Sequence, residues 1–321
     1  MKIVVLDGSG LNPGDLSWQE IAMQGDLEIY DKTPPELILQ RSKDAEILIT
    51  NKTPLTAQTL ARLPRLQYIG LCSTGYNIVD LKAAAERGIP VTNVPNYCTL
   101  AVAQMTFALL LEITNQVGVH NNAVHAGEWS RSSNFCFWKT PLMELESKTM
   151  GVMGFGSIGQ RVAQIASAMG MNVIVNTRRK IGMPPFCKAV DFETLLRRSD
   201  VLSLNVPLTP QTEKIINSKT LSLMKPDAIL INTSRGQVLD EKAVACALNE
   251  DRLGGCGVDV LSTEPPREEN PMLTAKNCVI TPHIAWAAKQ SRERLMHMVA
   301  ENLRCYLNGM AQNVVNGVQE R

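Results

Sequence analysis

The sequence is poor in aromatic residues and carries almost no net charge. Phe, Trp and Tyr make up 5% of its 321 residues, and the formal net charge at pH 7 is +1. Nucleic-acid-binding surfaces are usually basic, and many present aromatic side chains on which bases stack. The sequence has no long run of Lys or Arg that would supply a local basic patch. We therefore expect no nucleic acid among the partners of this protein.

Long apolar runs are also missing. No uninterrupted apolar stretch reaches the roughly 18 residues that a membrane-spanning helix needs. The apolar run near the N-terminus, residues 3–6, is too short for the hydrophobic part of a signal peptide. We therefore expect no membrane contact and a location in the reducing cytoplasm.

Residue patterns typical of metal sites are absent. None of the eight cysteines belongs to a C-x-x-C pair, and no Cys/His cluster has the spacing of a zinc site. The cysteines are scattered through apolar segments, where a thiol behaves as a small buried hydrophobic group. We expect no metal and no disulfide framework from these residues: Cys72, Cys98, Cys136, Cys187, Cys246, Cys256, Cys278 and Cys305.

The first hundred residues alternate short β-branched runs with helical patterns. The runs predict strands at 3–6, 27–30, 46–50, 66–71 and 91–94, with helices at 35–41, 57–63 and 80–87 between them. Asp80 is a good N-cap for its helix, and Gly88 suits the left-handed position after the helix ends. Strands that alternate with helices in this way form a parallel sheet covered on both faces.

A second series of the same kind begins near residue 149. It predicts strands at 150–153, 173–176, 201–205, 228–232, 257–260 and 279–281. A long helix is predicted before it, at about 100–126, and its apolar character indicates burial in the fold or in a subunit contact. The chain ends on an amphipathic helix at 287–308, with Leu295, Val299 and Leu303 in its apolar stripe and Gly309 after it.

A glycine-rich turn follows the strand predicted at 150–153. Residues 154–159 read G-x-G-x-x-G, and a helix is predicted at 160–169. In this strand–turn–helix context, Gly154 permits a tight turn, Gly156 lets the backbone approach a pyrophosphate, and Gly159 allows close packing. The N–H groups at the helix start then face the phosphates. The motif favours a dinucleotide site over the alternative, a glycine-rich turn without a ligand.

The next strand should end near the adenine ribose of such a dinucleotide. NAD-binding domains usually carry Asp or Glu there, roughly 20 residues past the turn. This chain has Thr177, Arg178, Arg179 and Lys180 instead. Arg can bind a 2′-phosphate through two parallel hydrogen bonds. The segment favours NADP(H), with NAD(H) as the alternative if these cations only form a solvated loop.

Three polar segments each follow a predicted strand, at the edge where open α/β sheets bind ligands. They contain Arg235, Glu264 and His283. Reduction of a 2-keto acid needs these groups: Arg235 can clamp the carboxylate, and His283 can donate a proton to the carbonyl oxygen. Glu264 can hold the imidazole and favour its protonated form. Each residue alone is more often structural, but their joint placement after strands downstream of a dinucleotide turn favours a site.

These motifs resemble those of the D-isomer-specific 2-hydroxyacid dehydrogenase family, in order and over nearly the whole chain. Besides the glycine-rich turn, they are T-S-R-G at 233–236, D-V-x-x-x-E-P at 259–265 and P-H-I at 282–284. The resemblance implies that Arg235, Glu264 and His283 are the catalytic residues of an NAD(P)-dependent enzyme.

The resemblance also implies the architecture: α/β, with two doubly wound parallel-sheet domains. A flavodoxin-like substrate domain would comprise residues 1–98 and 287–321. A Rossmann cofactor domain, residues 99–286, would be inserted into it, with the active site in the cleft between domains. The long helix matches the dimer-forming region of the family, which implies a homodimer.

Further site residues follow from the resemblance. The loop Ser73, Thr74 and Gly75 matches the substrate-carboxylate loop, and Trp138 joins Arg235 among the expected substrate contacts. The expected cofactor contacts are Thr99, Gly154, Gly156, Ser157, Ile158, Gly159, Thr177, Arg178, Arg179, Pro207, Thr233, Ser234, Asp259 and His283.

Within the family, three features resemble the glycerate dehydrogenase, or hydroxypyruvate reductase, group: N-F-C-F-W at 134–138, H-I-A-W at 283–286, and Gln104. They imply hydroxypyruvate/D-glycerate and glyoxylate/glycolate as substrate pairs, while another 2-keto acid stays open. The alternative from another functional class is an NAD(H)-binding corepressor of the same fold. Such a protein can keep the three catalytic residues but would turn over keto acids poorly.

Overall fold

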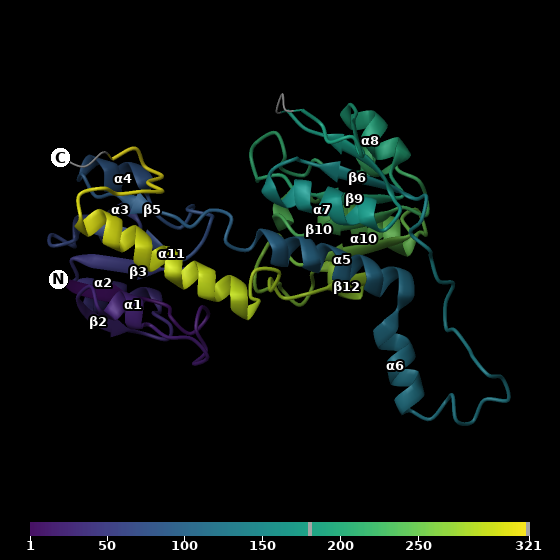
Figure 1. Ribbon diagram of the computed structural model, residues 1–321, viewed down its shortest axis with the longest axis horizontal. Helices are drawn as coiled ribbons and strands as arrows, with labels where there is room; N and C mark the ends of the chain where they lie inside the picture. The colour runs from purple at the N-terminus through teal and green to yellow at the C-terminus, as the bar shows by residue number, and fades with distance from the viewer. Residues whose placement is uncertain (179–181, 319–321) are drawn as a thin grey trace. The chain divides into compact units, whose positions relative to one another are not determined.

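The computed structural model describes residues 1–178 and 182–318, and the chain forms two compact units (Figure 1). Unit 1 comprises Met1–Cys98 and Ala287–Arg321, and unit 2 comprises Thr99–Trp286. Each unit is an α/β structure built on its own parallel sheet.

Unit 1 contains five parallel strands in the order β2-β1-β3-β4-β5. This is the doubly wound order of flavodoxin-like folds. The strands are β1 (Lys2–Val5), β2 (Asp26–Ile29), β3 (Ile47–Thr50), β4 (Tyr68–Leu71) and β5 (Val91–Thr92). The helical segments between them are α1 (Gln19–Ala22), η1 (Pro35–Leu37), α2 (Ile38–Ser42), α3 (Ala57–Ala61) and α4 (Leu81–Glu86). Asp80 caps α4 as predicted, since its carboxylate accepts the Ala83 N–H at 3.0 Å.

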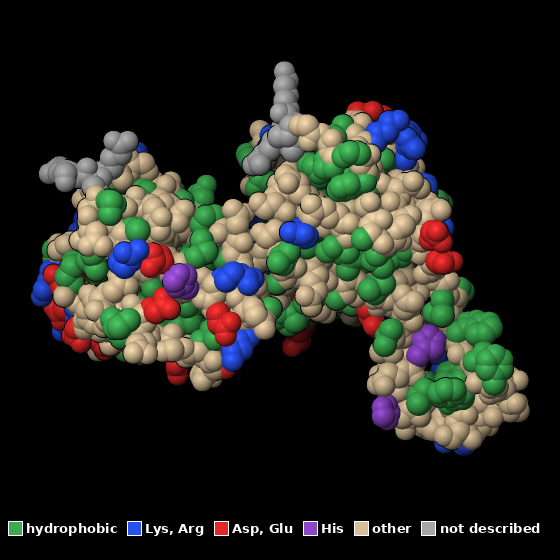
Figure 2. Space-filling model, viewed as in Figure 1, with side chains coloured by type: hydrophobic (Ala, Val, Ile, Leu, Met, Phe, Trp, Pro, Cys, Tyr) green, Lys and Arg blue, Asp and Glu red, His purple; other side chains and the backbone are tan. Residues whose placement is uncertain are grey.

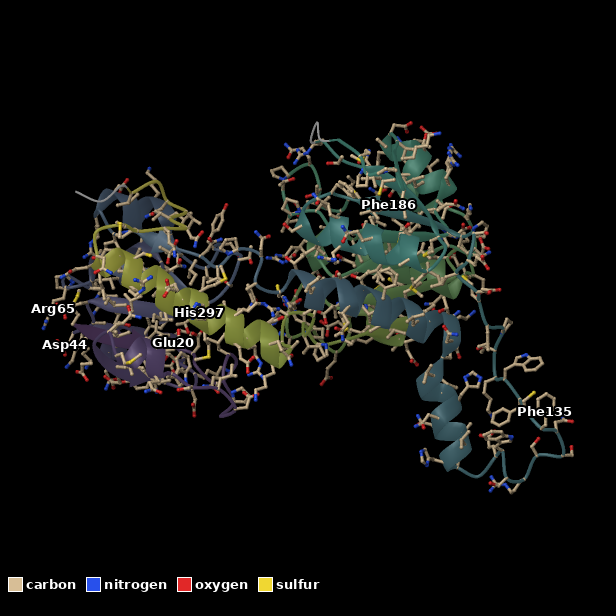
Figure 3. All side chains as sticks on the ribbon, viewed as in Figure 1. Glu20, Asp44, Arg65, Phe135, Phe186 and His297 are labelled. Carbon is tan, nitrogen blue, oxygen red and sulfur yellow. The ribbon has the colours of Figure 1, made fainter. Side chains whose placement is uncertain are left out.

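The last helix, α11 (Lys289–Leu307), packs on this sheet. Its Arg292 donates two hydrogen bonds of 2.7 Å to the carboxylate of Asp15. Farther along, Tyr306 stacks on Tyr68 of β4 with ring centroids 4.6 Å apart. Figure 3 shows His297 of α11 directed at Glu20 of α1, with Nδ1 and Oε2 2.8 Å apart. These contacts explain why the C-terminal helix belongs to the N-terminal sheet.

Unit 2 contains seven parallel strands in the order β12-β11-β10-β9-β6-β7-β8. They are β6 (Thr149–Met153), β7 (Asn172–Asn176), β8 (Cys187–Ala189), β9 (Val201–Leu204), β10 (Ile229–Asn232), β11 (Gly255–Val258) and β12 (Cys278–Ile280). The strand order reverses beside β6, which is the topological switch point where Rossmann folds bind ligands. The predicted fold class, two doubly wound parallel sheets, is confirmed.

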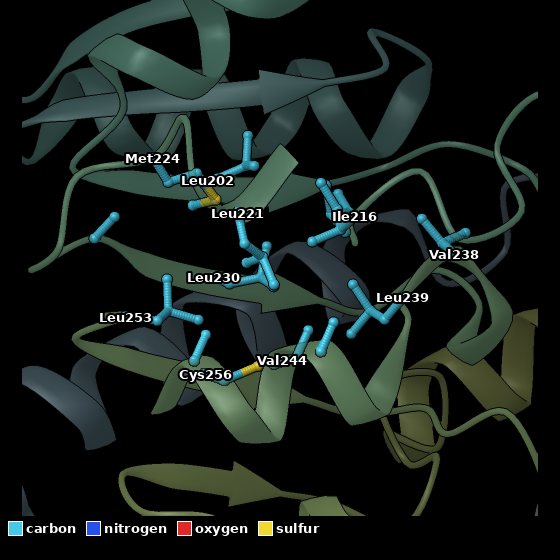
Figure 4. Packing of buried hydrophobic residues seen from close by; sticks show 14 of the residues in the cluster. Leu202, Ile216, Leu221, Met224, Leu230, Val238, Leu239, Val244, Leu253 and Cys256 are labelled. Atoms are coloured by element: carbon cyan, nitrogen blue, oxygen red, sulfur yellow. The ribbon is translucent and has the colours of Figure 1, made fainter. Parts of the chain in front are cut away.

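Helices cover both faces of the second sheet. One face carries α8 (Phe192–Arg198), α9 (Ser218–Leu221) and α10 (Glu241–Asn249), with the short turns η2 (Gly236–Val238) and η3 (Pro271–Thr274). Figure 4 shows Val244 of α10 packed with Leu230 and Cys256 of the sheet. The other face is covered by α5 (Thr99–Asn115) and α7 (Ser157–Ala168). A Cβ at Gly257 would lie 2.9 Å from the Leu109 Cβ, so glycine lets α5 pack close to β11.

The predicted single helix at 100–126 is wrong, because the structure contains two helices. α5 ends at Asn115, α6 (Val117–His125) follows, and the axes bend by 58°. Gln116 has a left-handed φ of 48°. The Thr114 carbonyl oxygen accepts the Met143 N–H instead of continuing the helical ladder. Periodicity does not reveal such a break, since its cause lies nearly thirty residues away in the sequence.

Two other expectations also need correction. Strand β8 was not predicted, because its three residues are partly or fully exposed and carry no apolar alternation. The cysteines are all free, but only Cys72 and Cys256 are buried, and Cys246 is exposed.

Among the described residues, no single helix is long and apolar enough to cross a membrane. The bent pair α5 and α6 passes that test together by length and composition only.

Candidate active site

The predicted catalytic residues of unit 2 follow three adjacent strands. Arg235 comes after β10, Glu264 after β11 and His283 after β12. All strands of the sheet are parallel, so their carboxyl ends share one edge. The glycine-rich turn after β6 lies on the same edge, two strands from β10. The sheet therefore gathers the separate sequence motifs along one rim.

The side chains of His283 and Glu264 are joined by a hydrogen bond. The His283 Nδ1 atom lies 2.6 Å from Glu264 Oε2, and the side chains are 29% and 36% exposed. The second carboxylate oxygen of Glu264 accepts the Leu261 N–H at 3.1 Å. That bond fixes the carboxylate against its own loop. The imidazole is consequently held from its Nδ1 side, and Nε2 is the ring nitrogen left for chemistry.

Asp259 holds the loop that carries His283. Its buried carboxylate accepts the Thr281 hydroxyl at 2.5 Å and the N–H groups of Ile284 and Ala285 at 2.9 and 2.8 Å. His283 itself has a φ of 55°. A left-handed conformation costs a non-glycine residue about 1–3 kcal/mol and persists only where its surroundings enforce it. The Asp259 carboxylate supplies that enforcement from both sides of His283.

A buried asparagine shapes the turn that presents Arg235. The Asn232 side chain accepts the Ser234 N–H at 3.0 Å and the Ser234 hydroxyl at 2.7 Å, and it donates to the Arg235 carbonyl oxygen. The Arg235 side chain is exposed, with Nη1 donating to the Ser234 carbonyl oxygen at 2.7 Å. A Cβ at Gly236 would lie 1.9 Å from the Leu261 carbonyl carbon. Glycine is therefore required for the Arg235 turn to lie against the loop of Glu264.

Two of these supporting residues were missed from the sequence. Asn232 has a local signal, an Asx-type turn in which its side chain binds the residue two positions on. Glu241 of α10 has no local signal, because its partner Ser262 lies twenty-one positions away in the sequence. The Glu241 carboxylate accepts the N–H and the hydroxyl of Ser262 at 2.6 and 2.7 Å. It also accepts the Asn270 amide at 2.9 Å. Glu241 thus fastens the loop of Glu264 from a distant part of the sequence.

The three glycines of the phosphate-type turn differ in what surrounds them. Gly154 has a φ of 88°, and a Cβ there would lie 2.4 Å from the Asn205 carbonyl oxygen. A Cβ at Gly159 would lie 2.1 Å from the Gly154 carbonyl oxygen. Apart from its chain neighbours, no atom of the described residues lies within 4 Å of the Cβ position at Gly156, so the packing that the structure describes does not require glycine there. Close approach of a ligand is the remaining reason for Gly156.

The helix after this turn offers unpaired donors. Gly156 is the N-cap of α7, and no side chain caps the helix. The first N–H groups of a helix have no partner within it and carry a partial positive charge. Ser157 and Ile158, the first two residues of α7, stand at this position. The turn therefore fits the pyrophosphate of a dinucleotide.

The remaining predicted cofactor residues of unit 2 lie at strand ends or at the start of α5. Arg178 is exposed after β7, next to Thr177, and Arg179 lies outside the described residues. Pro207 follows β9, and its carbonyl oxygen accepts the Thr212 hydroxyl at 2.6 Å. The Thr233 hydroxyl lies 3.2 Å from that of Thr106 on α5. Thr99 is the first residue of α5.

The predicted substrate loop of unit 1 follows β4. The Ser73 hydroxyl donates to the Gly75 carbonyl oxygen at 2.6 Å. The Thr74 hydroxyl donates to the Val94 carbonyl oxygen at 2.8 Å, and the Asn93 amide donates to the Thr74 carbonyl oxygen at 2.7 Å. Hydrogen bonds from the side chains of Ser73 and Asn93 to carbonyl oxygens of the loop thus fix the shape of the loop. Trp138 lies in the segment after α6 and is 66% exposed.

Comparison with known proteins identifies the family. Residues 107–285 match the model of the D-isomer-specific 2-hydroxyacid dehydrogenase NAD-binding domain. A hydroxypyruvate reductase of Blautia hydrogenotrophica is 46% identical, over 98% of this chain and 100% of that protein. This chain belongs to the D-isomer-specific 2-hydroxyacid dehydrogenase family. It is an enzyme of that type, and unit 2 contains the nicotinamide-dinucleotide domain.

Two further relatives span the same length. A glycerate dehydrogenase of Methylorubrum extorquens is 37% identical, over 98% of both chains. The solved structure of an acyclic imino acid reductase in complex with NADPH and D-Arg is 34% identical, with a TM-score of 0.86. It is matched over 98% of this chain and 100% of its own. The predicted relationship to the glycerate dehydrogenase and hydroxypyruvate reductase group is confirmed.

Proposed function

We propose that this enzyme reduces hydroxypyruvate to D-glycerate, and glyoxylate to glycolate, with a reduced nicotinamide cofactor. The observation that carries the proposal is the 2.6 Å bond between His283 and Glu264, two residues from adjacent strand ends beside that of Arg235. The names of the relatives, hydroxypyruvate reductase and glycerate dehydrogenase, support the substrate pair.

Arg235 is proposed as the carboxylate anchor. Its exposed guanidinium donates one N–H to the Ser234 carbonyl oxygen. A guanidinium has five N–H donors in a planar fork, so paired donors remain for a carboxylate. A clamped carboxylate fixes the orientation of the adjacent carbonyl, which is the part of catalysis that positioning supplies.

His283 is proposed as the acid and base. In reduction it donates the Nε2 proton to the carbonyl oxygen as an alkoxide develops, and in oxidation it accepts that proton. Glu264 on Nδ1 keeps the ring oriented, so that Nε2 is the nitrogen that exchanges the proton. The cofactor, when bound, supplies the hydride, and the protein residues orient and polarise the substrate.

Unit 2 is proposed as the cofactor domain and unit 1 as the substrate domain. The turn at Gly154, Gly156 and Gly159 would hold the pyrophosphate, with the N–H groups of Ser157 and Ile158 as donors. We assign Thr99, Pro207, Thr233, Ser234 and Asp259 to the rest of the cofactor. Backbone N–H groups of Ser73, Thr74 and Gly75, together with Trp138, are assigned to the substrate.

The cofactor is proposed to be NADP(H). Arg178 is exposed directly beyond β7, and neither Asn176 nor Thr177 before it is a carboxylate. Arg178→Ala is expected to raise the KM for NADPH by about 10–100-fold, since one charge-assisted hydrogen bond is worth about 1.5–3 kcal/mol. The KM for NADH, which lacks the 2′-phosphate, should stay within about twofold. Steady-state kinetics with both cofactors measure this, and equal changes would contradict the assignment.

A homodimer is also proposed, formed through the arm composed of α6 and the segment up to Leu142. Figure 2 shows hydrophobic side chains gathered on this arm. Phe135 is 89% exposed, Trp138 66% and Val117 64%. Large clustered apolar surfaces on a folded protein generally mark an interaction site.

The eight free cysteines support a reducing, cytoplasmic location.

The anchor role has a direct test. Arg235→Lys keeps the charge but loses the planar fork, so kcat/KM for hydroxypyruvate should fall by about 10–100-fold. Dihydroxyacetone, a ketone of similar size without a carboxylate, serves as the control substrate. Its low rate should be unaffected by the substitution. A variant with wild-type kcat/KM for hydroxypyruvate would show that Arg235 does not bind the carboxylate.

A further inference from the structure

Two cysteines lie side by side beneath the active-site rim. Cys256 on β11 and Cys278 on β12 are partners in the parallel ladder. Their side chains point to the same face of the sheet, because both pack in the cluster under α10. Cys256 is fully buried there (Figure 4), whereas Cys278 is partly exposed. The pair thus combines a partly exposed cysteine with a buried one.

The two thiols influence each other's ionisation. Interaction with Cys278, together with burial, raises the pKa of the Cys256 thiol. Interaction with Cys256 lowers the pKa of the Cys278 thiol. The thiolate is the nucleophilic form of cysteine. The partly exposed Cys278 is therefore the residue expected to react first, with Cys256 as its ladder partner on the same face of the sheet.

We propose that Cys256 and Cys278 form a redox modification site, a dithiol that hydrogen peroxide converts to an intramolecular disulfide. The Cys278 thiolate attacks one peroxide oxygen and the O–O bond breaks, which gives a sulfenic acid and a hydroxide. The Cys256 sulfur then attacks the sulfenic sulfur, and the S–O bond breaks. The thiol protons leave in water. Two thiols and one peroxide thus give one disulfide and two waters.

The spacing of the two strands allows this bond after a local shift of the backbone. Neighbouring strands lie about 4.8 Å apart, and disulfides join Cα atoms about 4.4–6.8 Å apart. Their Cβ atoms must come within about 3.5–4.5 Å, closer than side-by-side strand residues normally lie. Oxidation therefore has to draw the two strands together locally. β12 is an edge strand, so it can move without displacing a further strand.

Both strands lead directly into the catalytic loops. β12 ends at Ile280, three residues before His283, and β11 ends at Val258, next to Asp259. A displacement of β12 disturbs the hydrogen bonds by which Asp259 holds the His283 loop. Oxidation is therefore expected to lower turnover reversibly. This consequence for activity depends on the proposed function, whereas the disulfide itself does not.

The disulfide is tested by mass spectrometry of the intact, fully reduced enzyme after treatment with hydrogen peroxide. The expected product is a cross-linked peptide pair containing Cys256 and Cys278, lighter by two hydrogen atoms and split by dithiothreitol. Cys278→Ser removes the partly exposed cysteine, and Cys256→Ala is the second variant. Cys246→Ser is the matched control, since Cys246 is an exposed thiol of the same unit. The two test variants should form no cross-link, and the control should form it fully.

Activity is measured on the same samples. Peroxide should lower kcat of the wild type and of Cys246→Ser at least fivefold, with recovery in dithiothreitol, and leave Cys278→Ser unchanged. Absence of the Cys256–Cys278 cross-link overturns the modification site. A cross-link that leaves kcat unchanged overturns the link to the catalytic loops. An untreated enzyme without turnover contradicts the proposed function instead, while the cross-link can still be scored.

Discussion

The Glu264 carboxylate matters because of the charge that it places on one side of the His283 imidazole. Reduction needs an imidazole that donates its proton to the developing alkoxide. Glu264 Oε2 lies 2.6 Å from Nδ1, so its charge stands against the ring that carries this proton. Glu264→Gln keeps a hydrogen-bond acceptor but removes the charge. The kcat for hydroxypyruvate should therefore fall.

The size of the loss is also predicted. Positioned general acids contribute about 10²–10⁴-fold, so a weakened acid should cost kcat about 10–100-fold near neutral pH. Glu241→Gln is a comparison variant that disturbs the same loop without removing charge from His283. If Glu264→Gln lowered kcat no more than Glu241→Gln does, Glu264 would be only a structural support of the loop.

Among single residues, the sequence points more clearly to the proposed catalytic residues than to the residues that hold their loops in place. Arg235, Glu264 and His283 stand out because a charged or titratable residue follows each of three strands. Asn232 binds Ser234 within its own turn, whereas Glu241 binds a neighbouring loop. Glu241 in particular binds Ser262, twenty-one positions away, and no spacing rule links the two.

At the scale of the elements, the turn between β6 and α7 allows a specific prediction. Glycine is needed at Gly156 for ligand approach and at Gly159 for packing, so the two substitutions should have different effects. Gly156 has an extended backbone, and within residues 1–178 and 182–318 only its chain neighbours lie near its Cβ position. Gly156→Ala should fold with unchanged thermal stability and bind NADPH about tenfold or more weakly. Gly159→Ala meets the Gly154 carbonyl oxygen and should cost about 1–3 kcal/mol of stability.

Thermal unfolding and fluorescence titration with NADPH measure the two effects separately. The prediction requires that Gly156→Ala change the dissociation constant and not the melting temperature. Normal NADPH affinity in Gly156→Ala would mean that the cofactor pyrophosphate does not approach this turn.

Most strands and helices follow from the sequence, since buried parallel strands appear as short β-branched runs between helical patterns. The exceptions have physical causes. The long helix breaks at Gln116, where Met143 takes the Thr114 carbonyl oxygen. β11 begins two residues earlier than expected, because Gly255 and Gly257, needed for the close approach of α5, hide the apolar pattern. β8 is too short and exposed to show any pattern.

At the scale of the whole molecule, the proposed homodimer can be tested at the arm that contains α6. Phe135→Glu places a charge on its most exposed aromatic side chain (Figure 3). If the arm forms the dimer contact, this charge should raise the dimer dissociation constant by about tenfold or more. Phe186→Glu is the matched control, because Phe186 is also exposed on unit 2 but lies outside the arm.

Sedimentation velocity over a range of protein concentrations measures the dissociation constant of each variant. Wild type and Phe186→Glu should sediment as dimers at concentrations where Phe135→Glu dissociates. Equal sedimentation of all three proteins would exclude the arm around Phe135 as the contact. The sequence implies a subunit contact for the long helix at about 100–126, but it does not single out the segment after this helix, which contains Phe135.

The proposed function is tested most directly by the loss of reduced-nicotinamide absorbance when purified enzyme meets hydroxypyruvate. NADPH and NADH are each supplied with hydroxypyruvate, glyoxylate, pyruvate and longer 2-keto acids, and His283→Ala is measured beside the wild type. We expect rapid oxidation with hydroxypyruvate and glyoxylate, a preference for NADPH, and a loss of about 10²–10⁴-fold in His283→Ala. Binding of NADPH without oxidation by any keto acid would contradict the function and favour an NAD(P)(H)-binding corepressor.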